Sequence, residues 1–236
     1  MNATWYQTSS KTTTTSSSTS MDISSCLDLK SVLKASQALS SELELETLLT
    51  QMIGIVIKNV GAEKSYLILN KDGQWVIEAS GTIASDEVQV LQSIPIEAVS
   101  YSSDSPMVSN AIANYVIRTQ KSLVLHDAVH EGEFTRDPYI LEQQPKSILC
   151  TPLINQGKLV GILYLENNLT TGAFTPDRLE VLNLLSTQAA ISIENAKLYT
   201  QLRESESKWT QLLEAVPVGI SVHDLKGKVC YINQTG

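Results

Sequence analysis

Two long apolar segments joined by a short polar turn constrain the fold of this chain more than any other feature. Residues 147–154 and 158–166 have the length and aliphatic content of strands, and Asn155-Gln156-Gly157 between them is a turn sequence. Both segments are too continuously apolar to leave a face in water, so we expect them at the centre of a sheet. Pro152 cannot donate to a strand ladder, which predicts a bulge or an exposed edge there.

A second hairpin and two helices precede this pair of strands. Residues 65–69 and 74–79 alternate in polarity on either side of Asn70-Lys71-Asp72-Gly73, a strong hairpin signal. Apolar residues at helical spacing predict one helix over residues 28–40 and another that Gly61 ends. Ser41 and Glu44 have the form of a capping box, which predicts the start of that second helix.

Two irregular segments lie between the hairpins. Residues 81–110 are small, polar and aperiodic apart from a strand expected around residues 94–99, and residues 127–146 are interrupted by Pro138 and Pro145. Between them, the pattern predicts a short helix over residues 111–118 and a short strand over residues 122–126. Loops of this length are uncommon and often functional, so a ligand cavity is expected between them and the sheet.

The last third of the chain predicts one long helix. Thr175 and Pro176 supply an N-cap and a first-turn proline, and no breaker follows until about Ala215. Positions spaced by alternating fours and threes form a stripe, here called the C-terminal stripe: Leu184, Gln188, Ile191, Asn195, Leu198, Leu202, Ser205, Trp209, Leu212 and Val216. Residues 176–196 carry a second apolar face that can cover the sheet. Residues 198–216 have no sheet to cover, so we expect a parallel dimer helix or signalling linker there, with Leu198, Leu202, Trp209 and Leu212 as contacts.

Composition narrows the classes of function. The 236 residues hold 17 Lys and Arg against 25 Asp and Glu, a formal net charge of -8, which argues against nucleic acid or an anionic membrane as partner. Thirteen of the first twenty residues are Ser or Thr, which predicts a disordered linker over residues 1–27. Neither a signal peptide nor an apolar run of membrane-spanning length occurs, so we expect a cytoplasmic protein.

The order of these segments resembles a GAF domain, a small-molecule-sensing α+β module of signalling proteins. The resemblance covers residues 28–200 and rests on four segments: 145–153 (PKSILCTPL), 157–167 (GKLVGILYLEN), 172–175 (GAFT) and 188–196 (QAAISIENA). It implies a central antiparallel sheet flanked by helices, with long N- and C-terminal helices. The segments are most similar to the GAF region of cyanobacterial multi-sensor signal transduction kinases, which implies a sensory or regulatory role in a kinase or two-component protein.

A shorter resemblance begins at Leu212. Residues 213–220 (LEAVPVGI) and 223–233 (HDLKGKVCYIN) are similar to the opening strands of a PAS domain, which implies that residues 201–215 are a signalling helix and residues 212–236 a truncated PAS start. A strand pair without the rest of its sheet is marginally stable. The output kinase and the remaining PAS elements are expected outside this chain.

The chain lacks the sequence motifs of the enzyme classes considered. Phosphate loops, kinase triplets, zinc helices and nucleophile turns are all absent from the sequence, so we expect no catalysis and no metal site. GAF domains that attach bilin use a Cys beside the pocket, and residues 127–140 contain none, so covalent bilin is not expected and no cofactor is predicted. One alternative stays open: a redox enzyme similar to the GAF proteins that reduce free methionine sulfoxide, using Cys150.

The ligand pocket is expected between the sheet and the two irregular segments. Aromatic and titratable residues of these segments are its predicted lining: Tyr101, Tyr115, His126, Asp127, Phe134, Asp137 and Tyr139. The resemblance implies that a small ligand or a partner changes the packing over the sheet and shifts the terminal helices of a homodimer. A structural dimerisation module with an empty pocket is the other alternative.

Overall fold

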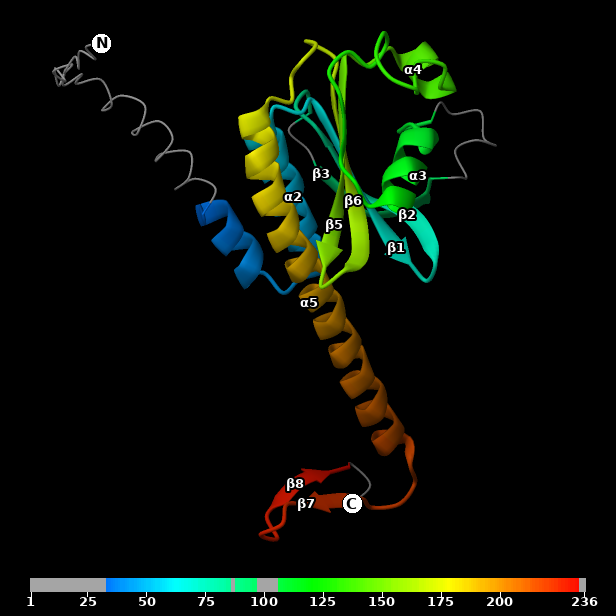
Figure 1. Ribbon diagram of the computed structural model, residues 1–236. Helices are drawn as coiled ribbons and strands as arrows, with labels where there is room; N and C mark the ends of the chain where they lie inside the picture. The colour runs from blue at the N-terminus through cyan, green and yellow to red at the C-terminus, as the bar shows by residue number, and fades with distance from the viewer. Residues whose placement is uncertain (1–32, 86–87, 97–105, 234–236) are drawn as a thin grey trace, which may run out of the picture.

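A computed structural model describes residues 33–85, 88–96 and 106–233, and Figure 1 shows a sheet with helices on both of its faces. Six strands form the sheet in the order β3-β2-β1-β6-β5-β4, with every neighbouring pair antiparallel. The strands are β1 (Lys64–Lys71), β2 (Gln74–Thr82), β3 (Val88–Pro95), β4 (Leu123–Leu125), β5 (Ser147–Asn155) and β6 (Lys158–Asn167). The predicted α+β class, with a central antiparallel sheet flanked by helices, is therefore confirmed.

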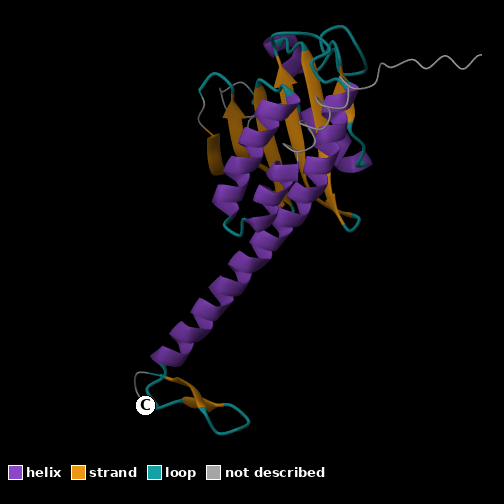
Figure 2. Cartoon of the chain, turned by 90° about the vertical axis from the view of Figure 1, so that its left-hand side faces the viewer, coloured by secondary structure: helices purple, strands orange, loops and turns teal. Residues whose placement is uncertain are grey.

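The two faces of the sheet carry separate apolar cores. Helices α2 (Leu45–Val60) and α5 (Pro176–Ala215) cover one face, as Figure 2 shows, and a helix over residues 33–41 adds Leu39 to the same core. On the other face lie α3 (Asn110–Thr119) and α4 (Pro138–Gln143), drawn in green in Figure 1. Alternation along β1 and β6 sends successive side chains to opposite cores, which is how both strands become buried over most of their length.

Both predicted hairpins are present, and their turns explain their sequences. Asp72 and Gly73 have φ angles of 53° and 90°, and Gln156 and Gly157 have φ angles of 48° and 79°. Positive φ at both central residues is the requirement of the tight turn whose twist matches that of antiparallel strands. Pro152 lies in β5 beyond the residues that pair with the edge strand β4, because β4 pairs only with residues 148–150. The register between β5 and β6 shifts just after Pro152, between Leu153 and Ile154.

Three local predictions differ from the structure. Ser41 is the last residue of the helix over 33–41, and its hydroxyl donates to the carbonyl of Ala38, so the predicted capping box is wrong. The chain instead turns at Glu42, whose carboxylate accepts the N–H groups of Leu43 and Glu44 at 3.1 and 3.0 Å. Strand β3 covers Val88–Pro95 and overlaps the strand expected around residues 94–99 only at its end, whereas residues 97–99 lie outside the described residues. The short helix α4 was not predicted within residues 127–146.

Helix α5 runs from Pro176 to Ala215, the bounds that the sequence predicted. Its first half packs on the sheet through Leu182, Leu185, Ala189 and Ile193, whereas residues 198–212 are all exposed. Figure 1 shows this second half extending away from the sheet. Strands β7 (Ser221–His223) and β8 (Val229–Ile232) form a separate two-stranded sheet beyond its end, and their assignment to a PAS domain stays a prediction.

None of the helices in the described residues is long and apolar enough to cross a membrane.

Candidate functional site

Four polar side chains lie within the apolar core on the α3 and α4 face of the sheet. We call Tyr66, Tyr139, Tyr164 and Glu166 the tyrosine–glutamate cluster. Tyr66 of β1 lies opposite Tyr164 of β6, and their ring centroids are 6.3 Å apart in an edge arrangement. Glu166 follows two residues later on β6, so its side chain points to the same face. Helix α4 brings Tyr139 over this part of the sheet.

Glu166 is the most unusual member of the cluster because it is a fully buried acidic residue. The hydroxyl of Tyr139 donates to its Oε1 atom at 2.5 Å. The other oxygen, Oε2, is also buried. Burial raises the pKa of Glu166, although the hydrogen bonds from Tyr139 and Tyr164 and the charge of Lys64 oppose this shift.

The three tyrosines of the cluster are held in the protonated form. Burial, reinforced by the neighbouring Glu166 charge, raises the pKa of Tyr66, Tyr139 and Tyr164. The hydroxyl oxygen of Tyr164 accepts the backbone N–H of Ser109 at 3.3 Å. The Ser109 side chain in turn caps α3 by accepting the N–H of Ile112. The cluster therefore joins β1 and β6 to both helices of this face.

A small pocket, here called the β1–β2 pocket, opens beside Tyr66 where β1 begins and β2 ends. Its volume is about 280 Å³, and it is lined by Lys64, Tyr66, Ser80, Gly81, Thr82, Ser85, Gln89 and Met107. Ligand pockets in proteins usually span about 300–1,000 Å³. The β1–β2 pocket therefore has room for a small metabolite and not for a tetrapyrrole.

The structure places the predicted pocket residues in several different environments. Tyr139 belongs to the tyrosine–glutamate cluster, and Asp137 caps α4 by accepting the Tyr139 backbone N–H at 2.9 Å. Tyr115 and Phe134 form a separate edge-to-face pair with centroids 5.7 Å apart. Tyr101 lies outside the described residues.

The two titratable residues at the end of β4 have local roles. His126 is exposed, and its carbonyl oxygen accepts from the N–H of Gly172 and the hydroxyl of Ser147. Asp127 pairs with the Nδ1 atom of His130 at 3.0 Å, and this bond lowers the pKa of Asp127. These contacts hold a surface loop, and neither side chain lies among the lining residues of the β1–β2 pocket.

Sequence reasoning missed three members of the cluster, namely Tyr66, Tyr164 and Glu166. A signal was present in the sequence, because Glu166 and Tyr164 interrupt or end an otherwise aliphatic strand. Charged residues are almost never fully buried without a partner, so an acidic residue at that place indicates a specialised position.

Cys150, the candidate nucleophile of the redox alternative, is fully buried on β5. Burial raises the pKa of its thiol. Because the thiolate is the reactive form, this environment disfavours nucleophilic or redox chemistry at Cys150.

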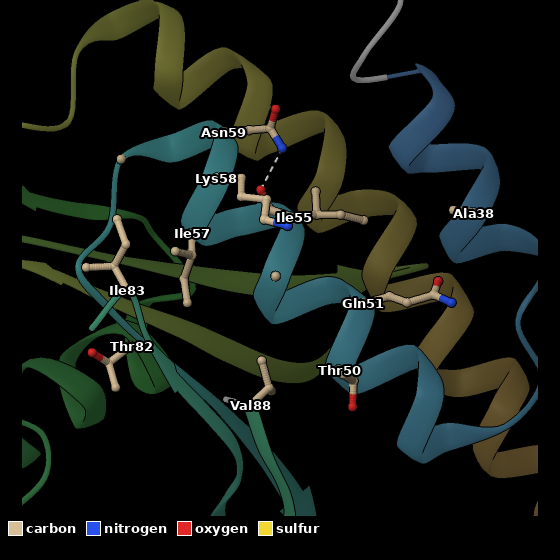
Figure 3. Close-up of a pocket in the computed structure, with 12 residues that line it drawn as sticks. Ala38, Thr50, Gln51, Ile55, Ile57, Lys58, Asn59, Thr82, Ile83 and Val88 are labelled. Atoms are coloured by element: carbon tan, nitrogen blue, oxygen red, sulfur yellow. Dashed lines mark hydrogen bonds between the residues drawn. The ribbon is translucent and has the colours of Figure 1, made fainter. Parts of the chain in front are cut away.

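A larger and more apolar pocket lies on the opposite side of the molecule, along the outer surface of α2. Figure 3 shows Gln51, Ile55, Lys58 and Asn59 of this helix lining it, with Ala38 across the opening and Val88 of β3 below. Its volume is about 630 Å³. The Asn59 amide donates to the carbonyl of Ile55 at 2.6 Å, so this side chain is already engaged with its own helix.

Comparison with known families agrees with this architecture: the model of the GAF domain matches residues 44–193, which is more than half of the chain. The chain belongs to the GAF family. The match includes the whole six-stranded sheet and ends within the sheet-covering half of α5, so the exposed half of α5 is an addition to the GAF fold.

Curated relatives of this GAF domain include large histidine kinases. The chain is 47% identical over 94 residues to "Hybrid signal transduction histidine kinase G" of Dictyostelium discoideum, a match that covers 40% of this chain and 3% of the kinase. It is 28% identical over 197 residues to "Peroxide stress-activated histidine kinase mak3" of Schizosaccharomyces pombe, covering 83% of this chain and 8% of the kinase. The chain thus spans less than a tenth of either kinase.

Solved structures show the same fold at low sequence identity. The GAF domain of an Acinetobacter phosphoenolpyruvate-protein phosphotransferase superposes with a TM-score of 0.53 at 16% identity, covering 73% of this chain and 95% of that one. A free methionine-R-sulfoxide reductase from Neisseria meningitidis superposes with a TM-score of 0.54 at 12% identity, covering 78% of this chain and 95% of that one. These similarities establish the fold alone.

Proposed function

We propose that this GAF domain is a non-catalytic sensory and regulatory module of a cytoplasmic, kinase-type signal transduction protein. In this proposal a small ligand on the α3 and α4 face changes the packing of the sheet, and α5 passes the change to an output module through a homodimer. The similarity to histidine kinases supports the regulatory role. The placement in a multi-sensor kinase with a following PAS domain, as in the cyanobacterial proteins, is part of the same proposal.

The observation that carries the proposal is the continuity of α5. One helix contains both the residues packed on the sheet and an exposed apolar stripe, so a shift of its first half moves its second half as a rigid body. Leu198, Leu202, Trp209 and Leu212 of the C-terminal stripe are each more than half exposed. A helix this apolar on one side is stabilised by packing against a second helix, and a like helix of another protomer supplies a matching stripe.

Polar contacts attach α5 to the sheet at the point where the helix begins to extend beyond the sheet. Glu194 accepts from the Asn155 amide at 2.5 Å and from the Lys158 ammonium at 3.3 Å, which ties the helix to the β5–β6 turn. Three residues later, the Lys197 ammonium donates to the carbonyl of Asn70 at the β1–β2 turn. A movement of either hairpin therefore displaces the start of the exposed half of α5. This attachment gives the proposed relay a physical route.

The two alternative functions have less support. A redox enzyme using Cys150 needs an accessible thiolate, and this thiol is buried with a raised pKa. A purely structural dimerisation module would have no use for the β1–β2 pocket on the α3 and α4 face.

Sedimentation velocity on the full chain tests the dimer on which the relay depends. The variant with Leu198, Leu202 and Leu212 replaced by Ser is expected to sediment as a monomer, and the wild type as a dimer. The matched control replaces Leu141 and Leu169, which are exposed but lie off α5, and should remain dimeric. A dimer that survives the three helix substitutions would show that α5 is not the interface.

A further inference from the structure

A polar residue is the buried one in the part of the chain that extends beyond the sheet. Of the described residues 197–233, Asn233 alone is buried, with 2% of its surface exposed. A buried amide is more informative than a buried apolar side chain, because polar groups are buried only at specific contacts. The hairpin of β7 and β8 therefore has no buried apolar residue against α5, and polar contacts hold it in place.

The end of α5 lacks one of the usual partners for its backbone. The helix ends at Ala215, Val216 is extended with φ and ψ angles of -74° and 125°, and Pro217 follows. At a common type of helix end, the N–H group two residues beyond the last helical residue donates to the carbonyl four residues before it. Pro217 occupies that position and has no N–H group, so it cannot donate to the carbonyl of Leu213.

The Asn233 side chain, directly after β8, supplies a donor in its place. Its Nδ2 atom donates to the carbonyls of Leu213, Val218 and Val216 at 3.1, 2.9 and 3.5 Å. Its Oδ1 atom accepts the N–H of Ile220 at 2.8 Å, and its backbone N–H donates to the Ile220 carbonyl at 3.1 Å. One side chain thus caps the helix and also closes the open end of the hairpin.

Tyr231 of β8 makes a second link to the same helix end. Its hydroxyl donates to the Oε1 atom of Glu214, in the last turn of α5, at 2.7 Å. Figure 1 shows β7 and β8 lying just beyond this end of the helix. Two links from one strand to one helical turn oppose a rotation of the hairpin about the helix axis, which a single link would allow.

We propose that Asn233 locks the hairpin of β7 and β8 to α5, so that helix and hairpin turn and shift as one rigid unit. The inference rests on the proposed function and deepens it, because it names the residue through which a movement of α5 reaches the segment beyond the helix. Without the lock, residues 216–219 would be a hinge, and the movement would end with the helix. A relay through rigid elements needs a firm joint at this point.

Pulsed electron paramagnetic resonance on the full chain tests the rigidity of this joint. One spin label is attached to Cys230, which is exposed on β8, and the other to the exposed half of α5 in a Ser207→Cys, Cys26→Ser background. Mixing with an excess of unlabelled chain restricts the measurement to distances within one chain. A single narrow distance distribution is expected with Asn233 present, and a distribution several-fold broader in Asn233→Ala.

Asn233→Asp separates the two roles of the side chain. The carboxylate keeps an acceptor for the N–H of Ile220 but has no hydrogen to donate to the carbonyls of α5. Amide hydrogen exchange over residues 211–216 is expected to become roughly tenfold faster in this variant, while Ile220 stays protected. Asn233→Ala is expected to release both. Lys226→Ala, at an exposed position of the hairpin turn, is the matched control and should exchange as the wild type does.

Three results would overturn the inference: a broad distance distribution in the chain that keeps Asn233, an equally narrow one in Asn233→Ala, or unchanged exchange at the helix end in Asn233→Asp. If one of these occurs while the chain remains a dimer through α5, the lock is wrong and the proposed function stands. A rigid joint in a chain that is monomeric would support the lock and count against the proposed function.

Discussion

At the scale of single residues, Glu166 makes the stability of the domain depend on pH. Burial raises its pKa in the folded state above the ordinary value of 4.5, so the folded state holds its proton more tightly than the unfolded state does. The stabilisation of the folded state by this bound proton is therefore complete below the ordinary pKa. It is lost as the pH rises through the raised pKa of the folded state.

Glu166→Gln removes this titration while it keeps an acceptor for the Tyr139 hydroxyl. The free energy of unfolding of the Gln variant, measured relative to the wild type, should rise as the pH increases above the ordinary pKa of 4.5. Urea denaturation at a series of pH values measures this difference. A difference that does not change with pH would mean that Glu166 has an ordinary pKa.

Alanine substitutions at two glycines, one in the sheet and one in a helix, are expected to change the stability of the domain in opposite directions. A Cβ atom at Gly161 would lie 2.6 Å from the backbone oxygen of Ile68, so Gly161→Ala should destabilise the domain by about 1–3 kcal/mol. Gly54 lies inside α2, where an added Cβ atom would have no neighbouring atom within 4 Å, so Gly54→Ala should stabilise the domain by about 0.5–1 kcal/mol. Chemical denaturation measures both, and effects of the same sign would contradict the packing described.

The sequence predicted only part of the site at this scale. Tyr139 was expected near the pocket because it lies in an irregular segment beside the sheet, but its partner Glu166 was not. The contact between them depends on α4 folding over β6, 27 residues further along the chain, and no local pattern encodes that placement. Lys64 and Glu166 likewise become neighbours only through the β1–β6 register, which joins strands far apart in sequence.

At the scale of elements, the attachment of α5 to the hairpin turns should be measurable. Glu194→Ala removes the contacts to Asn155 and Lys158, and since the Glu194 carboxylate is partly exposed we expect a loss of about 1 kcal/mol. Amide hydrogen exchange should become faster in the β5–β6 turn. Glu204→Ala, in the exposed half of the same helix, is the control and should leave exchange there unchanged. Equal exchange in both variants would mean that Glu194 does not hold the turn.

Elements specified by local chemistry were predicted well, and elements specified by tertiary packing were not. The two hairpins follow from Asp72-Gly73 and Gln156-Gly157, and α5 follows from Thr175-Pro176 and an unbroken helical sequence. The position of strand β3 was predicted incorrectly because the strand is irregular. It has positive φ angles at Leu91 and Ser93 and no clear alternation of burial. Its position is set by pairing with β2 and not by its own pattern.

At the scale of the whole molecule, the GAF domain is followed by the exposed half of α5. The α3 and α4 face holds the pocket, the α2 and α5 face holds the sheet-packed half of the long helix, and β1 and β6 contribute to both cores. In the proposed mechanism, a change at the pocket reaches α5 through the strands that the two cores share. The mechanism predicts that the folded chain binds a ligand and also forms a dimer.

Native mass spectrometry of the purified full chain, compared with the same sample after denaturation, tests the proposed sensory mechanism directly. It reports the oligomeric state and any bound mass in one measurement. The mechanism predicts a dimer that carries a small molecule, which is absent from the denatured chain because it is not covalently attached. A monomer would contradict the relay through α5, and a dimer with no bound mass would contradict the sensing role of the pocket.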